Sequence, residues 1–357
     1  MSLNLESQNQ IAAAPCPACK LCGSAGKFIY LAQPDRLFGA GGAWDLKQCS
    51  NPLCGLVWLD PMPLAGEIAK AYVKYYTHSP PSQTTTVPAA APAGFLRSIF
   101  RRMKHGYLQA TYGYPMGLQP AIAATLGILF RLLPGRRGKL NAELRWLQAV
   151  PRGCLLDVGC GSGRWLVHMR QLGWQVTGVD FDPGAVAIGR QQGLELACGS
   201  LEQQAFPAAG FDAITMNHVI EHLPDPVGTL RECRRLLKDG GKLVLVTPNS
   251  SSLGHRCFRQ NWRGLEPPRH LHLFSPASLR AALAAAGFEQ IELEPLVAPS
   301  VLYESILLRR NCWTNPESQS RRTQPAWLLA CLLGNFERTL TKAWPGLADF
   351  LLGIALK

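Results

Sequence analysis

The sequence predicts an α/β protein whose second half forms an open, doubly wound sheet. From residue 153 onward, short apolar runs alternate with helix-length segments, an order typical of a sheet covered by helices. A glycine-rich turn, Gly159–Gly163, follows the first apolar run and opens the first helical segment. Because such folds bind ligands at the carboxyl ends of their strands, we expect a ligand site at this turn.

The apolar pattern and its punctuation assign a residue range to each element. We expect strands at residues 154–158, 175–180, 194–197, 211–217, 242–247 and 290–296. Helices are expected at residues 164–172, 183–192, 226–237 and 276–286, the last ending at Gly287. Helical periodicity also marks residues 95–150, which are divided by Pro115, Pro120 and Pro134.

Basic residues are concentrated in one part of the chain. With 357 residues, of which 47% are hydrophobic and 17% charged, the composition is typical of a globular protein, but the formal net charge is +12. Residues 95–139 contain no Asp or Glu and eight basic residues: Arg97, Arg101, Arg102, Lys104, Arg131, Arg136, Arg137 and Lys139. This block suits a phosphate, an anionic lipid surface or nucleic acid, and a solvated basic surface is an equally good explanation.

Composition divides the chain into seven parts. We expect a flexible N-terminus (1–15), a cysteine-bearing ribbon-like domain (16–77), a proline-rich linker (78–94), a helical basic segment (95–150), a core domain (151–299), a helical insertion (300–345) and a last strand (346–357).

Targeting signals and cysteine content suggest a compartment. Residues 1–15 lack the basic start and apolar run of a signal peptide, and no apolar run reaches the roughly 20 residues of a membrane span. Twelve cysteines in a chain without an export signal favour a reducing compartment, with metal binding or burial of the thiols. We expect a cytoplasmic protein. The apolar and basic segments 95–139 and 325–346 leave open a peripheral contact with the inner face of the membrane.

The glycine turn and a second carboxylate suggest a nucleoside ligand. Seventeen residues after Gly163, the second expected strand ends in Asp180, which can accept hydrogen bonds from both ribose hydroxyls. The spacing G-x-G-x-G differs from the G-x-G-x-x-G of dinucleotide sites. Asp157 within the turn would repel a pyrophosphate and attract an ammonium group. These features favour S-adenosylmethionine over a dinucleotide.

Four motifs carry a resemblance to a known family. Leu155–Gly163 resembles motif I of the class I S-adenosylmethionine-dependent methyltransferases, and Val179-Asp180 resembles the acidic motif after their second strand. Segments 211–226 and 236–249 are similar to the family's fourth- and fifth-strand motifs, and all four stand in the family's order. The resemblance implies a seven-stranded Rossmann-like sheet in which residues 349–355 form the last, antiparallel strand.

The resemblance also implies roles for individual residues. Asp180 would bind the ribose, Phe181 would pack beside the adenine, and Asn217 would back the methionine portion. Where the family commonly has an acidic residue after strand three, this chain has Gly199-Ser200-Leu201, so Ser200 or the Leu201 amide would contact the adenine. The expected cofactor site comprises Asp157, Gly159, Cys160, Gly161, Gly163, Asp180, Phe181, Ser200, Leu201 and Asn217.

Candidate catalytic residues follow the fourth strand. Methyl transfer needs a general base only where the acceptor atom must lose a proton. His218 and His222 are four residues apart, so we expect them to share a helix face and either act as base or hold a divalent metal with Glu221. Segment 221–226 resembles a stretch that some quinone-type O-methyltransferases use near a metal. Capping of local backbone is the alternative role.

A second histidine-bearing segment lies farther along the chain. Residues 262–275 resemble a pattern of bacterial methyltransferases associated with saccharide, lipid or secondary-metabolite pathways. We expect Arg269, His270 and His272 on a loop above the sheet edge as acceptor contacts, with His270 as a second candidate base. A purely structural loop is the alternative.

Four cysteines are expected to bind zinc. Cys19 and Cys22 form one knuckle, and Cys49 and Cys54 form a second with the looser spacing C-x4-C. Cys16 makes another C-x-x-C with Cys19 and so competes for a place in the ligand set. Similar ribbons precede some sugar and polysaccharide-locus methyltransferases. Thiols that bind no metal remain the alternative.

These observations predict S-adenosylmethionine-dependent methyl transfer to a small-molecule, saccharide or lipid-linked acceptor, at oxygen. A sugar C-methyltransferase is the nearest alternative, suggested by the ribbon. The basic block favours a nucleic-acid-binding zinc-ribbon methyltransferase, but no Asn-Pro-Pro-Tyr type motif follows strand four. A dinucleotide-dependent oxidoreductase is disfavoured by the glycine spacing and Asp157.

Overall fold

The computed structural model describes residues 10–73, 95–151, 153–312 and 325–357. The chain folds as two compact units, one of Met1–His78 with Met216–Lys357 and one of Ser79–Thr215. Most of the expected flexible N-terminus and the whole of the expected linker 78–94 lie outside the described residues. The expected division into seven parts therefore stays a prediction.

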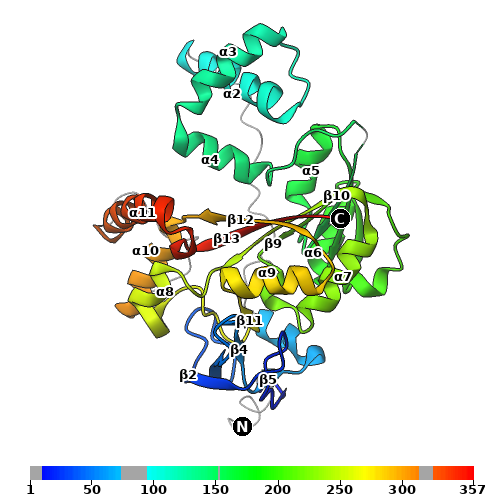
Figure 1. Cartoon of the computed structure of the whole chain (residues 1–357). Helices are drawn as coiled ribbons and strands as arrows, with labels where there is room; N and C mark the ends of the chain where they lie inside the picture. Colours follow the sequence, from blue (N-terminus) through cyan, green and yellow to red (C-terminus); the bar gives the residue numbers. More distant parts are fainter. Residues whose placement is uncertain (1–9, 74–94, 152, 313–324) are drawn as a thin grey trace. The chain divides into compact units, whose positions relative to one another are not determined.

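The predicted α/β class is confirmed by a main sheet of seven strands (Figure 1). Its order is β12 (Gln290–Leu296), β13 (Phe350–Leu356), β10 (Leu237–Pro248), β9 (Phe211–Asn217), β6 (Cys154–Val158), β7 (Gln175–Asp180) and β8 (Glu195–Cys198). β7 is parallel to both β6 and β8, whereas β13 runs antiparallel to its neighbours β10 and β12. This antiparallel strand near one edge is the expected last strand, shifted by one residue.

The strands form where apolar side chains can be buried on both faces of the sheet. All residues of β6 after Cys154 are buried, including Leu155 and Leu156 at 0% exposure. The expected ranges agree with the observed ones to within a residue except at β10, which begins five residues earlier than expected. That extension contains Gly240 and Gly241, residues that are more common in turns than in strands.

Helices connect the strands and begin at recognisable signals. They are α5 (Arg164–Gln171), α6 (Pro183–Gln191), α7 (Pro226–Leu236), α8 (Leu253–Phe258) and α9 (Pro276–Ala285). Asp182 accepts a hydrogen bond from the Gly184 amide at 2.9 Å, and Asp225 accepts one from Gly228 at 3.0 Å. Each of these caps precedes a proline at the first helical position, which explains why these helix starts were predictable.

Short turns of 3-10 helix and two helical additions complete the chain. The 3-10 turns are η1 (Ala65–Tyr72), η3 (Leu201–Gln204), η4 (Ile220–His222), η5 (Arg259–Asn261) and η8 (Pro345–Leu347). The basic segment forms α2 (Phe95–Tyr112), α3 (Pro120–Arg131) and α4 (Pro134–Glu143). Between β12 and β13 lie α10 (Pro299–Arg309) and α11 (Pro325–Ala343), which share an apolar core that includes Leu302, Tyr303 and Ala330.

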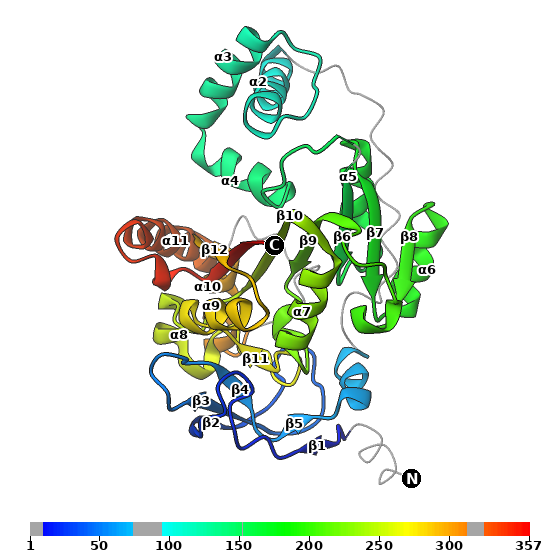
Figure 2. The same cartoon turned by 45° about the vertical axis from the view of Figure 1, so that its right-hand side comes forward.

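The cysteine-bearing segment forms a second sheet (Figure 2). Antiparallel strands β2 (Gly26–Gln33), β3 (Trp44–Cys49) and β4 (Val57–Leu59) are completed by β11 (His272–Leu273), which comes from the histidine-bearing segment 262–275. A further pair joins β1 (Ala13–Ala14) to β5 (Met62–Pro63). One strand of this sheet is therefore more than 200 residues away in the sequence. None of the described helices has the length and apolar character of a membrane span.

Candidate active site

The glycine turn adopts backbone dihedral angles that are unfavourable for residues with a side chain. Gly159, Gly161 and Gly163 have φ angles of +73°, +54° and +71°, in the left-handed region that favours glycine. A Cβ atom on Gly163 would lie 2.3 Å from Leu194 Cδ1, so the turn packs closely against the sheet there. At Gly161 no atom lies within 4 Å of that position, which leaves the surface of the turn open.

Asp180 is fixed at the end of β7 by two backbone amides. Gly161 donates to its Oδ2 at 2.7 Å and Asp182 donates to its Oδ1 at 2.9 Å. Burial raises the pKa of this carboxyl, which is 8% exposed, and the two amide hydrogen bonds oppose that rise. Each carboxylate oxygen keeps a further lone pair, so the group can still accept ribose hydroxyls.

The sequence interpretation assumed that the Asp157 carboxylate is free to act on a ligand. In the structure it is already paired. It is 1% exposed, forms an ion pair with Arg145 and accepts a hydrogen bond from Thr215 Oγ1 at 2.8 Å. Its charge is therefore already compensated inside the protein. The argument that Asp157 itself repels a pyrophosphate and attracts an ammonium group is wrong in this respect.

Arg145 is a residue that the sequence analysis missed. It follows α4 with a φ of +47°, and its guanidinium lies 3.6 Å from the centre of the Trp165 ring. It also donates to Thr215 Oγ1 at 2.8 Å. No local motif marks Arg145, because its partners Asp157 and Thr215 belong to other elements. The side chain is 14% exposed, so a cation is available beside the glycine turn.

The other expected cofactor residues occupy varied environments. Phe181 is 52% exposed and Asn217 is exposed, whereas Leu201 is buried. The Ser200 amide donates to Gln203 Oε1 at 3.1 Å. Burial raises the pKa of the half-buried Cys160, which keeps its thiol neutral. Their contacts with a cofactor stay predictions.

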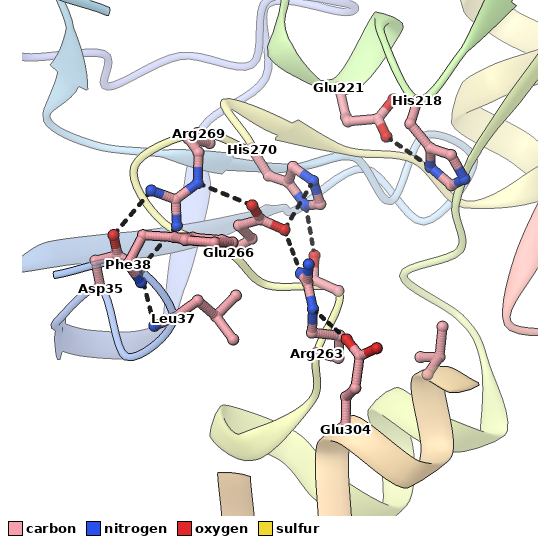
Figure 3. Close-up of polar contacts among 12 residues, drawn as sticks. Asp35, Leu37, Phe38, His218, Glu221, Arg263, Glu266, Arg269, His270 and Glu304 are labelled. Carbon is pink, nitrogen blue, oxygen red and sulfur yellow. Dashed lines mark hydrogen bonds and ion pairs between the residues drawn. The ribbon is translucent and has the colours of Figure 1, made fainter. Parts of the chain in front are cut away.

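His218 and Glu221 form a pair at the end of β9 (Figure 3). His218 Nδ1 lies 3.3 Å from Glu221 Oε1, and Thr247 donates to Glu221 Oε2 at 3.0 Å. The expectation that His218 and His222 share a helix face is wrong. His218 has a φ of +57° and precedes η4, a 3-10 turn of only three residues. Its imidazole therefore turns to Glu221 rather than to His222.

His222 and His270 lie together with Glu221. The two rings are 4.8 Å apart, and one ligand atom from each of Glu221, His222 and His270 lies within 4.8 Å of the others. His222 Nδ1 lies 2.9 Å from the Arg269 carbonyl, and His270 Nδ1 lies 2.7 Å from the Gly264 carbonyl. A carbonyl can only accept, so we assign the hydrogen to Nδ1 in both rings, which leaves each Nε2 with a lone pair. His222 Nδ1 also lies 2.9 Å from the Tyr72 phenolic oxygen, which therefore accepts a share of the same Nδ1–H.

Burial and neighbouring groups set the charges in this cluster. Burial lowers the pKa of His270 to about 4, although Glu266 opposes the shift, so the imidazole is neutral at pH 7. Burial would raise the pKa of Glu221, but the His218 hydrogen bond and the nearby histidines lower it to about 2. The hydrogen bond from His218 is the largest of the contacts that keep Glu221 ionised.

Arg269 and His272 are not acceptor contacts, contrary to the sequence prediction. Arg269 has 0% exposure and makes two hydrogen bonds of 2.7 and 2.8 Å to Asp35 and one of 2.8 Å to Glu266 (Figure 3). Arg263 extends the network to Glu266 and Glu304. His272 is fully buried in β11 opposite Trp58. Only His270 of the three reaches the cluster, because the buried charges fix the loop around it.

The four expected zinc ligands come together. Sγ atoms of Cys19 and Cys54 lie 3.7 Å apart, those of Cys22 and Cys49 lie 3.4 Å apart, and all four lie within 4.8 Å of one another. Tetrahedral zinc with bonds of about 2.3 Å would place sulfur atoms roughly 3.8 Å apart. Cys16 is not in this group. The donor set and spacing thus fit a closed zinc site.

Each pair of cysteines is held by a turn that ends in glycine. Gly23 and Gly55 have φ angles of +73° and +64°, and Gly23 donates to the Cys19 carbonyl at 2.9 Å. Burial raises the pKa of Cys19 to about 11, although backbone hydrogen bonds oppose the shift. A buried thiolate cluster needs a cation, so the fold of this segment and a metal ion would stabilise each other.

Comparisons with known proteins identify the family of this chain. A family model described as a methyltransferase domain matches residues 133–293. The ubiquinone biosynthesis O-methyltransferase of Xanthomonas oryzae pv. oryzae (strain PXO99A) is 36% identical over 186 residues, which cover 49% of this chain and 73% of that protein. The ubiquinone biosynthesis O-methyltransferase of Xanthomonas axonopodis pv. citri (strain 306) is also 36% identical, over 217 residues that cover 56% of this chain and 82% of that protein. With its glycine turn, Asp180 and seven-stranded sheet, the chain belongs to the class I S-adenosylmethionine-dependent methyltransferases.

Proposed function

We propose that this methyltransferase transfers the methyl group to a hydroxyl oxygen of a small-molecule acceptor, and that His270 receives the proton. The observation that carries the proposal is the cluster of Glu221, His222 and His270, in which a neutral imidazole lies beside a buried carboxylate. The relatives named as ubiquinone biosynthesis O-methyltransferases support oxygen as the acceptor atom and a ubiquinone precursor as the kind of acceptor.

The proposed base works through His270 Nε2. Adenosylmethionine supplies a methyl group on a sulfonium, whose sulfur leaves as a neutral thioether. As the acceptor oxygen bonds to the methyl carbon, its hydrogen moves to His270 Nε2, while Nδ1–H stays on the Gly264 carbonyl. The imidazolium so formed is stabilised by Glu266, whose Oε2 lies 3.7 Å from Nε2, and by the charge of Glu221.

For the cofactor, we propose two charged contacts in addition to the glycine turn. Asp180 accepts the ribose hydroxyls, since both of its oxygens are held in place by amides. Arg145 contacts the carboxylate of the methionine portion, since its guanidinium is fixed by Asp157 and Trp165 and partly exposed. Phe181, Ser200, Leu201 and Asn217 complete the proposed site on the strength of the family resemblance.

A divalent metal is the second candidate for activating the acceptor. Glu221, His222 and His270 each offer one ligand atom within 4.8 Å of the others, and a carbonyl at Nδ1 orients each imidazole so that Nε2 keeps a lone pair. A metal here would lower the pKa of an acceptor hydroxyl without a protein base. Activity that is lost after chelation and restored by Mg²⁺ or Mn²⁺ would select this mechanism over the base.

We also propose that Cys19, Cys22, Cys49 and Cys54 bind one structural Zn²⁺. The closed set of four sulfurs supports a structural role, because a catalytic zinc keeps an open coordination position.

The proposed reaction can be tested with a soluble catechol and adenosylmethionine carrying a ¹³C-methyl group. An O-methyl product, identified by the carbon chemical shift and by mass, is the expected result. His270→Ala should abolish the product while cofactor binding, measured by calorimetry, is retained. Exclusive C-methylation of the acceptor, or full activity of His270→Ala in the presence of a chelator, would overturn the proposal.

A further inference from the structure

The helix α3 places its large apolar side chains on the outside. Its buried positions are Ala123, Gly127 and Phe130, two of them small residues spaced four apart. The exposed large apolar residues on α3 and the turn that follows it are Ile122 (41% exposed), Ile128 (60%), Leu129 (44%), Leu132 (72%) and Leu133 (37%). A helix on a water-facing surface normally has the opposite arrangement.

The small buried residues allow α3 to lie close to α2. A Cβ atom on Gly127 would lie 3.2 Å from the Gly106 carbonyl oxygen, and one on Gly106 would lie 2.5 Å from Leu126 Cβ. The two helices therefore form a close-packed hairpin with its own aromatic contact between Tyr107 and Phe130. The inner face of α3 is packed against α2. The leucines and isoleucines on the outer face of α3 are not covered by this contact, so they need a different partner.

The charged residues of the same segment, residues 95–139, are all basic. Arg131, Arg136, Arg137 and Lys139 follow directly and are exposed, and α2 adds the exposed side chains of Arg97, Arg101 and Arg102. No Asp or Glu occurs between residues 95 and 139. An exposed apolar face in a segment whose charged residues are all basic is complementary to an anionic phospholipid surface, where acyl chains meet negatively charged headgroups.

Two other partners fit these observations less well. A second copy of the chain would bring a second basic block to the same interface, and like charges in close contact oppose association. Nucleic acid would match the cations, but the exposed apolar residues of α3 are aliphatic and offer no ring on which a base could stack.

We propose that the outer face of α3, defined by Ile122, Ile128, Leu129, Leu132 and Leu133, lies in the interface of a membrane that contains anionic phospholipids. With 12 residues, α3 is shorter than the roughly 20 residues of a membrane span, so it lies in the plane of the interface. The basic residues contact the headgroups. This contact does not depend on the identity of the methyl acceptor.

The helix α11 has the same arrangement and is a second candidate for this contact. Its buried positions include Ala326, Ala330 and Gly334, each four residues after the last. Its exposed side chains include Leu328 (62%), Leu332 (68%) and Phe336 (58%), and Arg338 and Lys342 follow them on the exposed surface. A lipid interface accounts for both helices with one kind of partner.

The test is flotation of the full chain with lipid vesicles. Neutral phosphatidylcholine vesicles are compared with vesicles that contain roughly 30% phosphatidylglycerol. We expect binding to the anionic vesicles only, and a decrease when salt is raised, because screening weakens the contact with headgroups. Ile128→Gln with Leu132→Gln should lower the partition coefficient at least about tenfold. Arg136→Gln with Arg137→Gln should lower it by about fivefold for each charge removed.

A matched control removes exposed apolar side chains elsewhere. Leu31 and Leu64 are 61% and 46% exposed in the other compact unit, and Leu31→Gln with Leu64→Gln should bind vesicles like the parent chain. Because all substituted side chains are exposed, circular dichroism and melting should be unchanged. The matched double variant in α11, Leu328→Gln with Leu332→Gln, reports whether that face contributes.

Three outcomes would overturn the proposal. The first is no flotation with anionic vesicles. The second is flotation that the α3 variants leave unchanged. The third is a dimer in sedimentation that these variants convert to a monomer, with no lipid binding, which would assign the α3 face to a second copy of the chain.

Discussion

The phenolic oxygen of Tyr72 and Nδ1 of His222 lie 2.9 Å apart, although the two residues are separated by 150 positions in the sequence. Tyr72 ends η1 in the cysteine-bearing part of the chain, whereas His222 belongs to the proposed acceptor site. The N-terminal segment thus reaches the cluster through a direct side-chain contact. Tyr72 acts on the reaction through His222 and is a positioning residue.

Replacing Tyr72 with Phe should lower kcat by about two- to tenfold, the usual range for one uncharged hydrogen bond. The affinity for adenosylmethionine should be unchanged, since Tyr72 acts on the proposed acceptor site through His222. Tyr30→Phe is the matched control, because Tyr30 makes the same 2.9 Å contact with His255 away from the cluster. Equal kinetics for both variants would remove Tyr72 from the site.

Asp180→Asn should weaken adenosylmethionine binding by about 10- to 100-fold, because hydrogen bonds to a charged acceptor are lost. Calorimetric titration measures this directly. Glu195 is an exposed carboxylate on the neighbouring strand β8, and Glu195→Gln should bind the cofactor normally. Parent-like binding by Asp180→Asn would contradict the proposed ribose contact.

The buried His272 should make the fold sensitive to acid. Burial lowers its pKa to about 4, whereas an unfolded histidine has a pKa near 6.5. The unfolded state therefore binds more protons between these values, and stability is lost as the pH falls from about 6.5 towards 4. At pH 5 the loss is about 2 kcal/mol. Urea unfolding of His272→Leu should show a smaller decrease between pH 7 and pH 5 than the parent chain, and an identical decrease would argue against this origin.

Metal analysis should give one zinc per chain, lost when Cys19→Ser is combined with Cys22→Ser. The Cys16→Ser variant should keep its zinc, since Cys16 is buried but outside the four-sulfur group. Removing the metal should also lower the melting temperature, because zinc binding and folding of such sites are coupled. Zinc that survives the double substitution would contradict the ligand set.

Arg269→Met should destabilise the fold by about 3–5 kcal/mol, because Asp35 would remain as a buried charge without its partner. Arg235→Met, which breaks an exposed pair with Glu232, should cost less than about 1 kcal/mol. Chemical denaturation measures both. Comparable effects at the two positions would show that the buried network does not hold the loop.

The parts of the fold that the sequence predicted depend on neighbours in the chain. The glycine turn and the proline-led helices are marked by residues close together in the chain, and Asp180 was found from the end of an apolar strand at a familiar distance from the turn. Arg145 and Tyr72 could not be found in this way, because their partners are 12 and 150 positions away. Arg269 and His272 were misassigned for the same reason. Polar residues on an expected loop suggest solvent, whereas Asp35, 234 positions distant, makes the interior favourable for Arg269. In β3 the alternation of buried and exposed residues was present in the sequence and was overlooked.

The short strand β11 has a consequence for the modularity of this enzyme. Its two residues pair with Val57 and Trp58, so one edge strand of the ribbon sheet comes from the catalytic part of the chain. Neither the ribbon segment nor the rest of the chain is therefore structurally complete without the other. A chain shortened to begin at residue 95 would expose the β11 edge, lose Asp35 opposite Arg269 and lose Tyr72 opposite His222. A substitution in the ribbon segment would then alter the contacts that hold the proposed acceptor site. We therefore expect the two segments to have coevolved.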